Sequence, residues 1–108
     1  MLPARVYLGM LLSDQGDFAG ARPHLEQALS MDPDNASVHN NLGIVLDELG
    51  DLQNAKKHLE LAVTIDPQYA LAHNNLGIVL AKLGDNAEAR AHHERAVALD
   101  PSFAKVPR

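Results

Sequence analysis

Histidines recur in this chain at a fixed spacing of 34 residues. One set is His24, His58 and His92, and a second is His39 and His73. Imidazoles that converge can bind a metal ion or transfer protons. A structural zinc site, however, needs four converging ligands, usually with cysteine among them, and this chain has no cysteine. We interpret the recurrence as a product of duplication, and we expect no metal site and no cofactor, only adventitious nickel or zinc binding.

Two further polar pairs are adjacent in the sequence. His92 and His93 form the densest local group of possible ligands, and Asp47 and Glu48 form a pair of carboxylates. Adjacent side chains on a helix point about 100° apart, so neither pair converges on one atom. The chain also contains no nucleophile-elbow, phosphate-loop or metalloprotease motif. We therefore expect that it is not an enzyme.

The histidine spacing belongs to a repeat that runs through the chain. The string HNNLGIVL occupies residues 39–46 and returns unchanged at 73–80. The segments 36–69 and 70–103 are identical at 19 of 34 positions. Such a period indicates tandem supersecondary units that bury a core only when stacked. We predict one domain with three tandem repeats: 1–108 overall, with repeats at about 2–35, 36–69 and 70–103, and 104–108 as a tail or a truncated next repeat.

Each repeat has the pattern of two helices. In the first half of 36–69, apolar residues fall at helical spacing: Val38, Leu42, Val45, Leu46 and Leu49. In the second half they do so again: Leu52, Ala55, Leu59, Ala62 and Val63. Between them, Gly50 suits the left-handed residue that ends a helix, and Asp51 suits the N-cap of the next. Pro67 then ends the second helix, because the residue before a proline is pushed out of the α region.

Two kinds of residue inside these helices are unusual. Glycine costs about 1 kcal/mol in a helix relative to alanine, yet Gly9, Gly43 and Gly77 share one phase. We expect close packing of the paired helices to compensate, with Ala55 as the small partner of Gly43. Pro23 falls beyond the first turn of its helix, where proline costs about 3 kcal/mol. The helix over 18–30 is therefore expected to be bent or to start late.

These features resemble the tetratricopeptide repeat family over about 2–103. The resemblance rests on the Leu-Gly pairs, the Gly-Asp turns, the periodic alanines and the Asp-Pro closures. The chain departs from the family where His39 and His73 replace a frequent aromatic residue and where leucine replaces a frequent tyrosine. The fold that the resemblance implies is all-α: a right-handed superhelical solenoid of three helix-turn-helix repeats.

In this family the first helix of each pair lines a concave inner wall. The resemblance therefore predicts a protein-protein interaction scaffold that binds an extended peptide or protein segment in that groove. Asparagine carries both a donor and an acceptor and can pair with a peptide backbone. Asn41 and Asn75 are similar to the asparagine ladder of O-linked N-acetylglucosamine transferase arrays. The predicted groove residues are Asn41, Asn75, Asn40, Asn74, Ile44, Ile78, Tyr7 and Met10; the alternative is that the asparagines are solvated positions inherited by duplication.

A second groove known in this family grips a C-terminal carboxylate with lysine, arginine and asparagine. Asn41 falls on one matching position. Val6, Leu71 and Asn75, however, stand where the resemblance expects basic residues. Because a carboxylate binds poorly without a cation, we predict that this clamp is absent.

Composition excludes several other functions. The net charge is −5 at pH 7, whereas a nucleic-acid binder normally carries a basic stripe. No apolar run approaches the roughly 20 residues that span a bilayer, so we expect no membrane insertion. The apolar start of the chain contains Arg5 and an early proline, and we interpret it as a helix, not a signal peptide. The absence of cysteine fits a cytoplasmic location.

The last repeat is more polar than the one before it. Leu52, Leu59 and Leu61 become Asn86, His93 and Arg95. This change is either an adapted terminal cap or ordinary drift. Uncovered ends would favour self-association, so a homo-oligomer through the repeat ends is one alternative function. Another is that the chain is the targeting array of a larger enzyme such as a glycosyltransferase.

Overall fold

The computed structural model describes residues 2–104, with side chains described from residue 4 onward. The chain forms six α-helices and a closing 3-10 turn: α1 (Leu2–Asp14), α2 (Phe18–Met31), α3 (Ala36–Glu48), α4 (Leu52–Ile65), α5 (Ala70–Lys82), α6 (Asn86–Leu99) and η1 (Pro101–Ala104). This all-α helical-repeat solenoid confirms the predicted fold class. The predicted tail after Ala104 lies outside the described residues.

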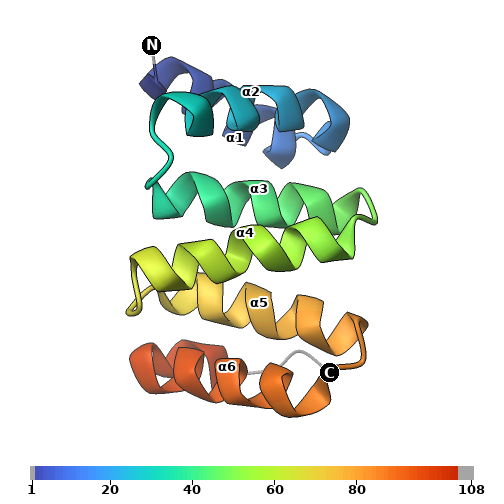
Figure 1. Cartoon of the computed structure of the whole chain (residues 1–108), viewed down its shortest axis with the longest axis vertical. Helices are drawn as coiled ribbons and strands as arrows, with labels where there is room; N and C mark the ends of the chain where they lie inside the picture. The colour runs from blue at the N-terminus through green and yellow to red at the C-terminus, as the bar shows by residue number, and fades with distance from the viewer. Residues whose placement is uncertain (1, 105–108) are drawn as a thin grey trace.

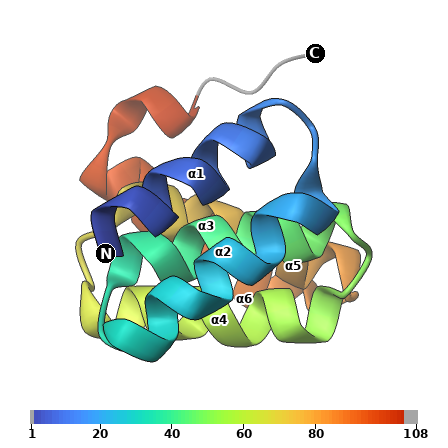
Figure 2. The same cartoon turned by 90° about the horizontal axis from the view of Figure 1, so that it is seen from above.

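The helices stack as three antiparallel pairs along the long axis of the molecule, which measures 37 × 24 × 22 Å (Figure 1). Each pair packs on the next, so α2 contacts α3 and α4 contacts α5. Figure 2 shows α1 on the side of the stack away from α2 and α4. We call the surface formed by α1, α3 and α5 the inner-helix face.

Capping residues set the ends of the helices where the sequence predicts them. Gly16, Gly50 and Gly84 have φ of 82°, 86° and 86°, the left-handed conformation that glycine adopts without strain. Asp51 caps α4 by accepting a hydrogen bond from the backbone N–H of Asn54 at 3.3 Å. The same N–H and the Asn54 side chain favour the charged carboxylate, and the side-chain bond contributes most to lowering the pKa of Asp51.

The core follows the predicted apolar stripes, which the helix pairs bury against one another. Fully or almost fully buried leucines, valines and alanines from five of the six helices form one cluster across all three repeats; these helices are α2, α3, α4, α5 and α6. Leu49 departs from the prediction because it is exposed. It is the C-cap residue of α3 and lies at the edge of the buried stripe.

The glycines inside the first helices allow close approach of the paired helix. A Cβ atom on Gly43 would lie 2.6 Å from Cγ of Leu59, which is fully buried on α4. A Cβ atom on Gly77 would lie 3.0 Å from the carbonyl oxygen of Ala89 on α6. The predicted close packing is confirmed at both positions, but the atoms nearest to Gly43 belong to Leu59 and not to the predicted partner Ala55. This close approach explains why glycine stands there despite its low helix propensity.

Of the two outcomes predicted for the second helix, the late start is wrong, whereas the bend stays a prediction. α2 begins at Phe18 and continues as α-helix through Pro23 to Met31. Pro23 has no N–H to donate to the carbonyl of Ala19, four residues earlier. Since Ala19 is exposed, water can donate to that carbonyl, and the Asp17 carboxylate caps the first turn through the N–H of Gly20 at 2.9 Å.

Candidate functional site

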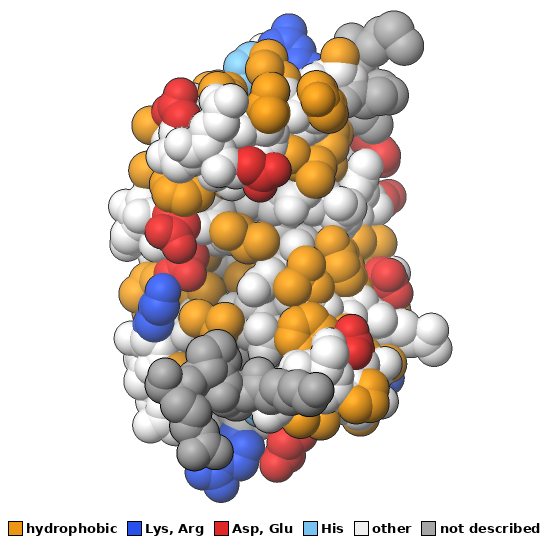
Figure 3. Space-filling model, turned by 180° about the vertical axis from the view of Figure 1, so that it is seen from behind, with side chains coloured by type: hydrophobic (Ala, Val, Ile, Leu, Met, Phe, Trp, Pro, Cys, Tyr) orange, Lys and Arg blue, Asp and Glu red, His pale blue; other side chains and the backbone are white. Residues whose placement is uncertain are grey.

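Six of the predicted groove residues come from equivalent positions of the three first helices, two from each: Tyr7 and Met10 on α1, Asn41 and Ile44 on α3, Asn75 and Ile78 on α5. Tyr7 exposes 69% of its surface, and Met10 and Ile78 are also exposed. Asn41, Ile44 and Asn75 are half-buried. Seen from behind, the molecule carries apolar side chains along its length with acidic side chains between them (Figure 3).

A hollow of about 250 Å³ separates α3 from α5 on this face. Ile44, Asn75 and Ile78 line it, so the structure brings these three predicted residues together. Lys82 and Asp47 also line the hollow, and Lys82 Nζ donates to both carboxylate oxygens of Asp47 at 2.9 and 3.1 Å. This ion pair joins the second and third repeats across the face.

Asn75 also joins the two repeats. Its Nδ2 donates a hydrogen bond to Oδ1 of Asn40 at 3.0 Å. Asn40 is only 1% exposed, and a polar side chain so deeply buried needs a partner. The structure therefore uses Asn40, a predicted ligand contact, as the support that orients Asn75.

The equivalent residue of the third repeat has a different partner. Asn74 is half-buried, and its Oδ1 accepts a hydrogen bond from Nδ1 of His93 on α6 at 3.2 Å. In the second repeat, Leu59 stands where His93 stands in the third. The replacement of that leucine by histidine thus supplies a donor that the second repeat lacks.

Asn41 differs from its counterpart Asn75 in having an unpaired amide. Its Nδ2 is buried and has no hydrogen-bond partner within the described residues. Asn75 bonds the residue 35 positions earlier, and 35 positions before Asn41 the chain has Val6, whose side chain has no acceptor. The local sequence is the same at both asparagines, but the first repeat does not provide the partner that the second does.

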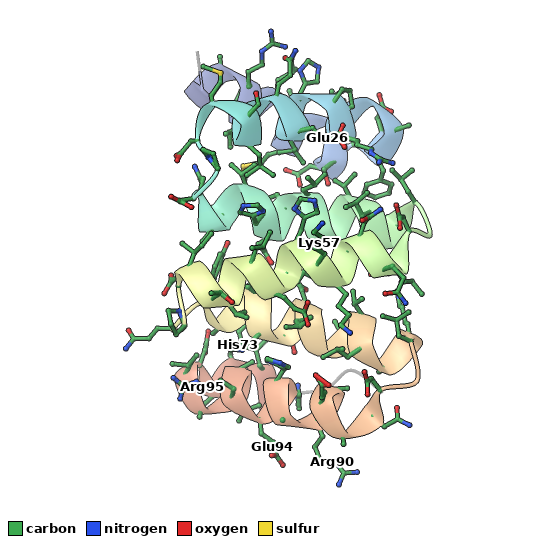
Figure 4. All side chains as sticks on the ribbon, viewed as in Figure 1. Glu26, Lys57, His73, Arg90, Glu94 and Arg95 are labelled. Atoms are coloured by element: carbon green, nitrogen blue, oxygen red, sulfur yellow. The ribbon has the colours of Figure 1, made fainter. Side chains whose placement is uncertain are left out.

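Two pairs of stacked histidines lie inside the second and third repeats. Nδ1 of His39 on α3 lies 3.0 Å from Nδ1 of His58 on α4, and His73 and His92 repeat this contact at 3.0 Å. In both pairs the ring centroids are 5.3 Å apart. Figure 4 labels His73, whose ring lies between α5 and α6.

The outer contacts of these rings determine where the protons lie. Nε2 of His39 donates to the carbonyl oxygen of Pro33 at 2.7 Å, and Nε2 of His73 donates to that of Pro67 at 2.9 Å. A neutral His39 therefore presents an unprotonated Nδ1, which accepts a hydrogen bond from the protonated Nδ1 of His58. Only one proton fits between the two facing nitrogens of each pair.

Burial is the main cause of a lowered pKa at the outer histidine of each pair. It disfavours the charged form of His58, and repulsion from His39, Lys57 and Arg22 lowers the pKa further, partly offset by Glu26. Burial likewise lowers the pKa of His92. Figure 4 shows Glu26 on α2 and Lys57 on α4, the helix that also carries His58.

Repulsion from His73 adds to the effect of burial on His92. The carboxylates of Glu88 and Glu60 act in the opposite direction and partly offset it. The local charges therefore differ between the two pairs, with cations nearer His58 and carboxylates nearer His92. Both pairs nevertheless disfavour the charged imidazole.

Sequence reasoning missed this pairing, although a signal was present. His39 and His58 are 19 residues apart, and so are His73 and His92. The first repeat breaks the pattern, because Arg5 stands 19 residues before His24. Nδ1 of His24 is buried and has no partner within the described residues.

Residues 2–104 were compared with two further classes of site, metal centres and membrane-spanning helices, and they form neither. No three His, Cys, Asp or Glu side chains in this part of the chain lie close enough together to hold a metal ion. No helix in the same range is long and apolar enough to cross a membrane.

Several solved structures have the same fold as this chain. The first TPR of Spaghetti (RPAP3) bound to HSP90 peptide SRMEEVD has a TM-score of 0.89 and 23% identity, covering 93% of this chain and 79% of that one. The crystal structure of MamA has a TM-score of 0.91 and 24% identity, covering 94% of this chain and 60% of that one. The Sgt2 TPR domain from Aspergillus fumigatus has a TM-score of 0.88 and 23% identity, covering 93% and 66%.

The sequence itself matches two models of one family. Residues 8–70 match a model described as tetratricopeptide repeat, and residues 70–103 match a second with the same description. Among curated proteins, no sequence matches this chain. The two family matches together cover most of the three predicted repeats, and the chain therefore belongs to the tetratricopeptide repeat family.

Proposed function

We propose that this chain is a protein-interaction scaffold whose inner-helix face binds an extended segment of a partner polypeptide. The observation that supports this most directly is the repetition of one polar and one apolar group along the face. Asn41 and Ile44 on α3 recur as Asn75 and Ile78 on α5, one repeat further along the stack. An extended peptide also repeats its backbone groups along its length, so the two can be matched without reading side chains.

The asparagines present acceptors to such a peptide. One N–H of Asn75 Nδ2 donates to Asn40, and Oδ1 of Asn75 is the acceptor that this side chain can offer to a ligand. Nδ2 of Asn41 is buried, so Oδ1 is again the atom available to a ligand. Each oxygen can accept a backbone N–H of the bound segment.

Apolar contact between these acceptors comes from four side chains of the same face: Ile44, Ile78, Met10 and Tyr7. Asn40 and Asn74 act in this proposal as supports, because Asn40 is enclosed and Asn74 is paired with His93. Each net hydrogen bond contributes about 0.5–1.5 kcal/mol, and the peptide loses entropy on ordering. Two asparagines with a few apolar contacts therefore favour binding no tighter than about micromolar.

The first TPR of Spaghetti (RPAP3) is bound to an HSP90 peptide, which supports a peptide ligand for this fold. That peptide, SRMEEVD, is acidic, and an acidic ligand calls for cations. This chain places Val6, Leu71 and Asn75 at the positions where the family clamp has basic residues. We therefore propose a ligand recognised through its backbone and apolar side chains, and we expect SRMEEVD not to bind.

The test selects a library of random linear peptides against the chain and measures the affinity of the selected peptides by titration. Asn41→Ala is expected to weaken them by about 2- to 10-fold, the loss of one hydrogen bond. Ile44→Ala should weaken them through lost apolar contact. Gln53→Ala, on the exposed surface of α4, is the matched control and should leave the affinity unchanged.

Two outcomes would contradict the proposal. Peptides that bind Asn41→Ala and Ile44→Ala as tightly as the wild type would place their site elsewhere. A library that yields no binder would mean that the repeated asparagines are solvated positions inherited by duplication. SRMEEVD serves as a comparison, and its tight binding would overturn the backbone-directed mode.

A further inference from the structure

Neighbouring repeats of this chain dock through the same sequence positions each time. α5 lies over α3 and α4, and the positions beneath it include Gly43, Ile44 and Leu59, which line the hollow of about 250 Å³ together with α5 residues. The first helix of one repeat thus covers the groove between the two helices of the repeat before it. This internal joint shows which surfaces of the repeat fit together.

At the C-terminal end, no further helix of the described residues covers the equivalent groove. The equivalent positions Gly77, Ile78 and His93 line a cavity of about 690 Å³ between α5 and α6. Phe103 of η1 and Ala81 also line this cavity, whose exposed lining is mostly apolar. The cavity stands where a further first helix would lie if the stack continued.

At the opposite end of the stack, α1 exposes the side that α3 and α5 bury. Leu8 and Leu11 are 40% and 39% exposed. Their equivalents Leu42 and Val45 on α3 are 1% and 0% exposed, and those on α5 are equally buried. The difference arises because α3 and α5 each pack against a preceding helix pair. α1 therefore carries a docking side that matches the open cavity at the other end.

We propose that α1 of one copy of this chain docks into the α5–α6 cavity of a second copy, in the register in which α5 docks on α3 and α4. The two mating surfaces lie at opposite ends of the long axis (Figure 1). Such a head-to-tail contact is heterologous and leaves one mating surface free at each end, so assembly continues beyond the dimer. The contact is distinct from peptide binding on the inner-helix face, although Tyr7 and Ile78 take part in both proposals.

The polar groups of the proposed joint also correspond to those of the internal joint. Inside the chain, Asn75 of the incoming helix donates to Asn40. In the proposed joint Tyr7 takes the position of Asn75, and Asn74 takes that of Asn40. The hydroxyl of Tyr7 can donate to Oδ1 of Asn74, which has a second lone pair beside its 3.2 Å bond from His93.

The C-terminal end is more polar than the internal groove, which weakens the joint. Asn86 and His93 line the cavity at the positions of Leu52 and Leu59. Arg90 also lines it, and Figure 4 shows Arg90 and Glu94 projecting from α6 at the end of the stack. Because less apolar area is buried than in the internal joint, we expect weak association. Monomers and assemblies should therefore coexist at chain concentrations that can be reached in solution.

The test measures weight-average mass by sedimentation equilibrium over a wide range of chain concentration. For the wild type, the mass should rise from 11.7 kDa with concentration and pass that of a dimer. Leu11→Arg places a charge on the α1 docking side, and Ala81→Arg places one in the cavity; Ala81 is exposed, so the fold tolerates the change. Each variant alone should remain monomeric.

An equimolar mixture of the two variants discriminates between modes of association. Leu11→Arg retains an intact cavity and Ala81→Arg retains an intact α1, so the mixture should form a heterodimer and stop there. Ala91→Arg, on the exposed surface of α6 outside the cavity lining, is the matched control and should associate like the wild type.

Two results would overturn the proposal of head-to-tail docking. A wild-type mass that stays at 11.7 kDa would overturn the proposal. Association that persists in Ala81→Arg alone would indicate contact between two α1 helices and would overturn it as well. Circular dichroism on each variant confirms that any loss of association occurs in a folded chain.

Discussion

The first repeat and the two that follow share one 34-residue pattern but differ in their polar contacts. In the second and third repeats, His39 pairs with His58 and His73 pairs with His92. In the first repeat Arg5 takes the place of the inner histidine, and His24 keeps a buried nitrogen without a partner within the described residues.

The joints between repeats also differ in their polar contacts, and again the first repeat has fewer of them. Asn75 and Lys82 bond Asn40 and Asp47 across the joint between the second and third repeats. At the joint between the first and second repeats, Val6 offers no acceptor, and Nδ2 of Asn41 has no partner within the described residues. The comparison teaches that a duplicated side chain keeps its structural role only where its partner was duplicated with it.

The largest expected effect is a difference in the free energy of unfolding between variants of two adjacent asparagines, Asn40 and Asn41. Asn40→Ala removes the acceptor of Asn75 and leaves a small cavity, so it should lower the free energy of unfolding by about 1–3 kcal/mol. Asn41→Ala removes an amide that is already unpaired and should change that energy by no more than about 0.5 kcal/mol. Urea denaturation followed by circular dichroism measures both.

Equal losses in the two variants would contradict the comparison, because they would assign both asparagines the same structural role. Asn41→Ala also separates stability from function. It should weaken peptide binding while leaving the fold intact, whereas Asn40→Ala should affect both.

A smaller effect is expected on acidification. Burial lowers the pKa of His58 and His92 in the folded chain. Below about pH 6.5 the unfolded chain therefore binds more protons than the folded chain does. The contribution of the histidine pairs is therefore complete above that pH and is lost as the pH falls. Urea midpoints at pH 7.5 and pH 5.5 should show lower stability at the acid pH.

The double variant His58→Gln and His92→Gln tests the cause of this loss. Glutamine can still donate to Nδ1 of His39 or His73 but does not titrate. The variant should lose less stability between the two pH values than the wild type does. An unchanged pH dependence would attribute the loss to other groups, such as the carboxylates at the helix N-termini.

Much of the fold could be predicted from the sequence because its signals are local and repeated. The period predicted an all-α helical-repeat solenoid, and the glycines with positive φ lie where the Gly-Asp turns predicted them. The late start predicted from Pro23 is wrong because the residue whose carbonyl loses its N–H partner, Ala19, is exposed and water can reach it.

The contacts of the candidate site could be predicted less well. Asn40 and Asn41 are adjacent identical residues, and only their partners in other repeats make one enclosed and the other half-buried. The histidine pairs are visible as a recurring interval of 19 residues, but that interval does not show which ring nitrogens face each other. The identity of a bound segment depends on surfaces that the repeat pattern does not encode.

The most direct test of the central comparison is native-state hydrogen exchange on the wild type and on Val6→Asn. The wild type should lose protection in α1 before α3, α4 and α5, because the first repeat lacks the polar contacts of the others. In Val6→Asn the new side chain can accept from Asn41, so protection of α1 should increase. Uniform protection along the wild-type chain, together with no gain in the variant, would contradict the account.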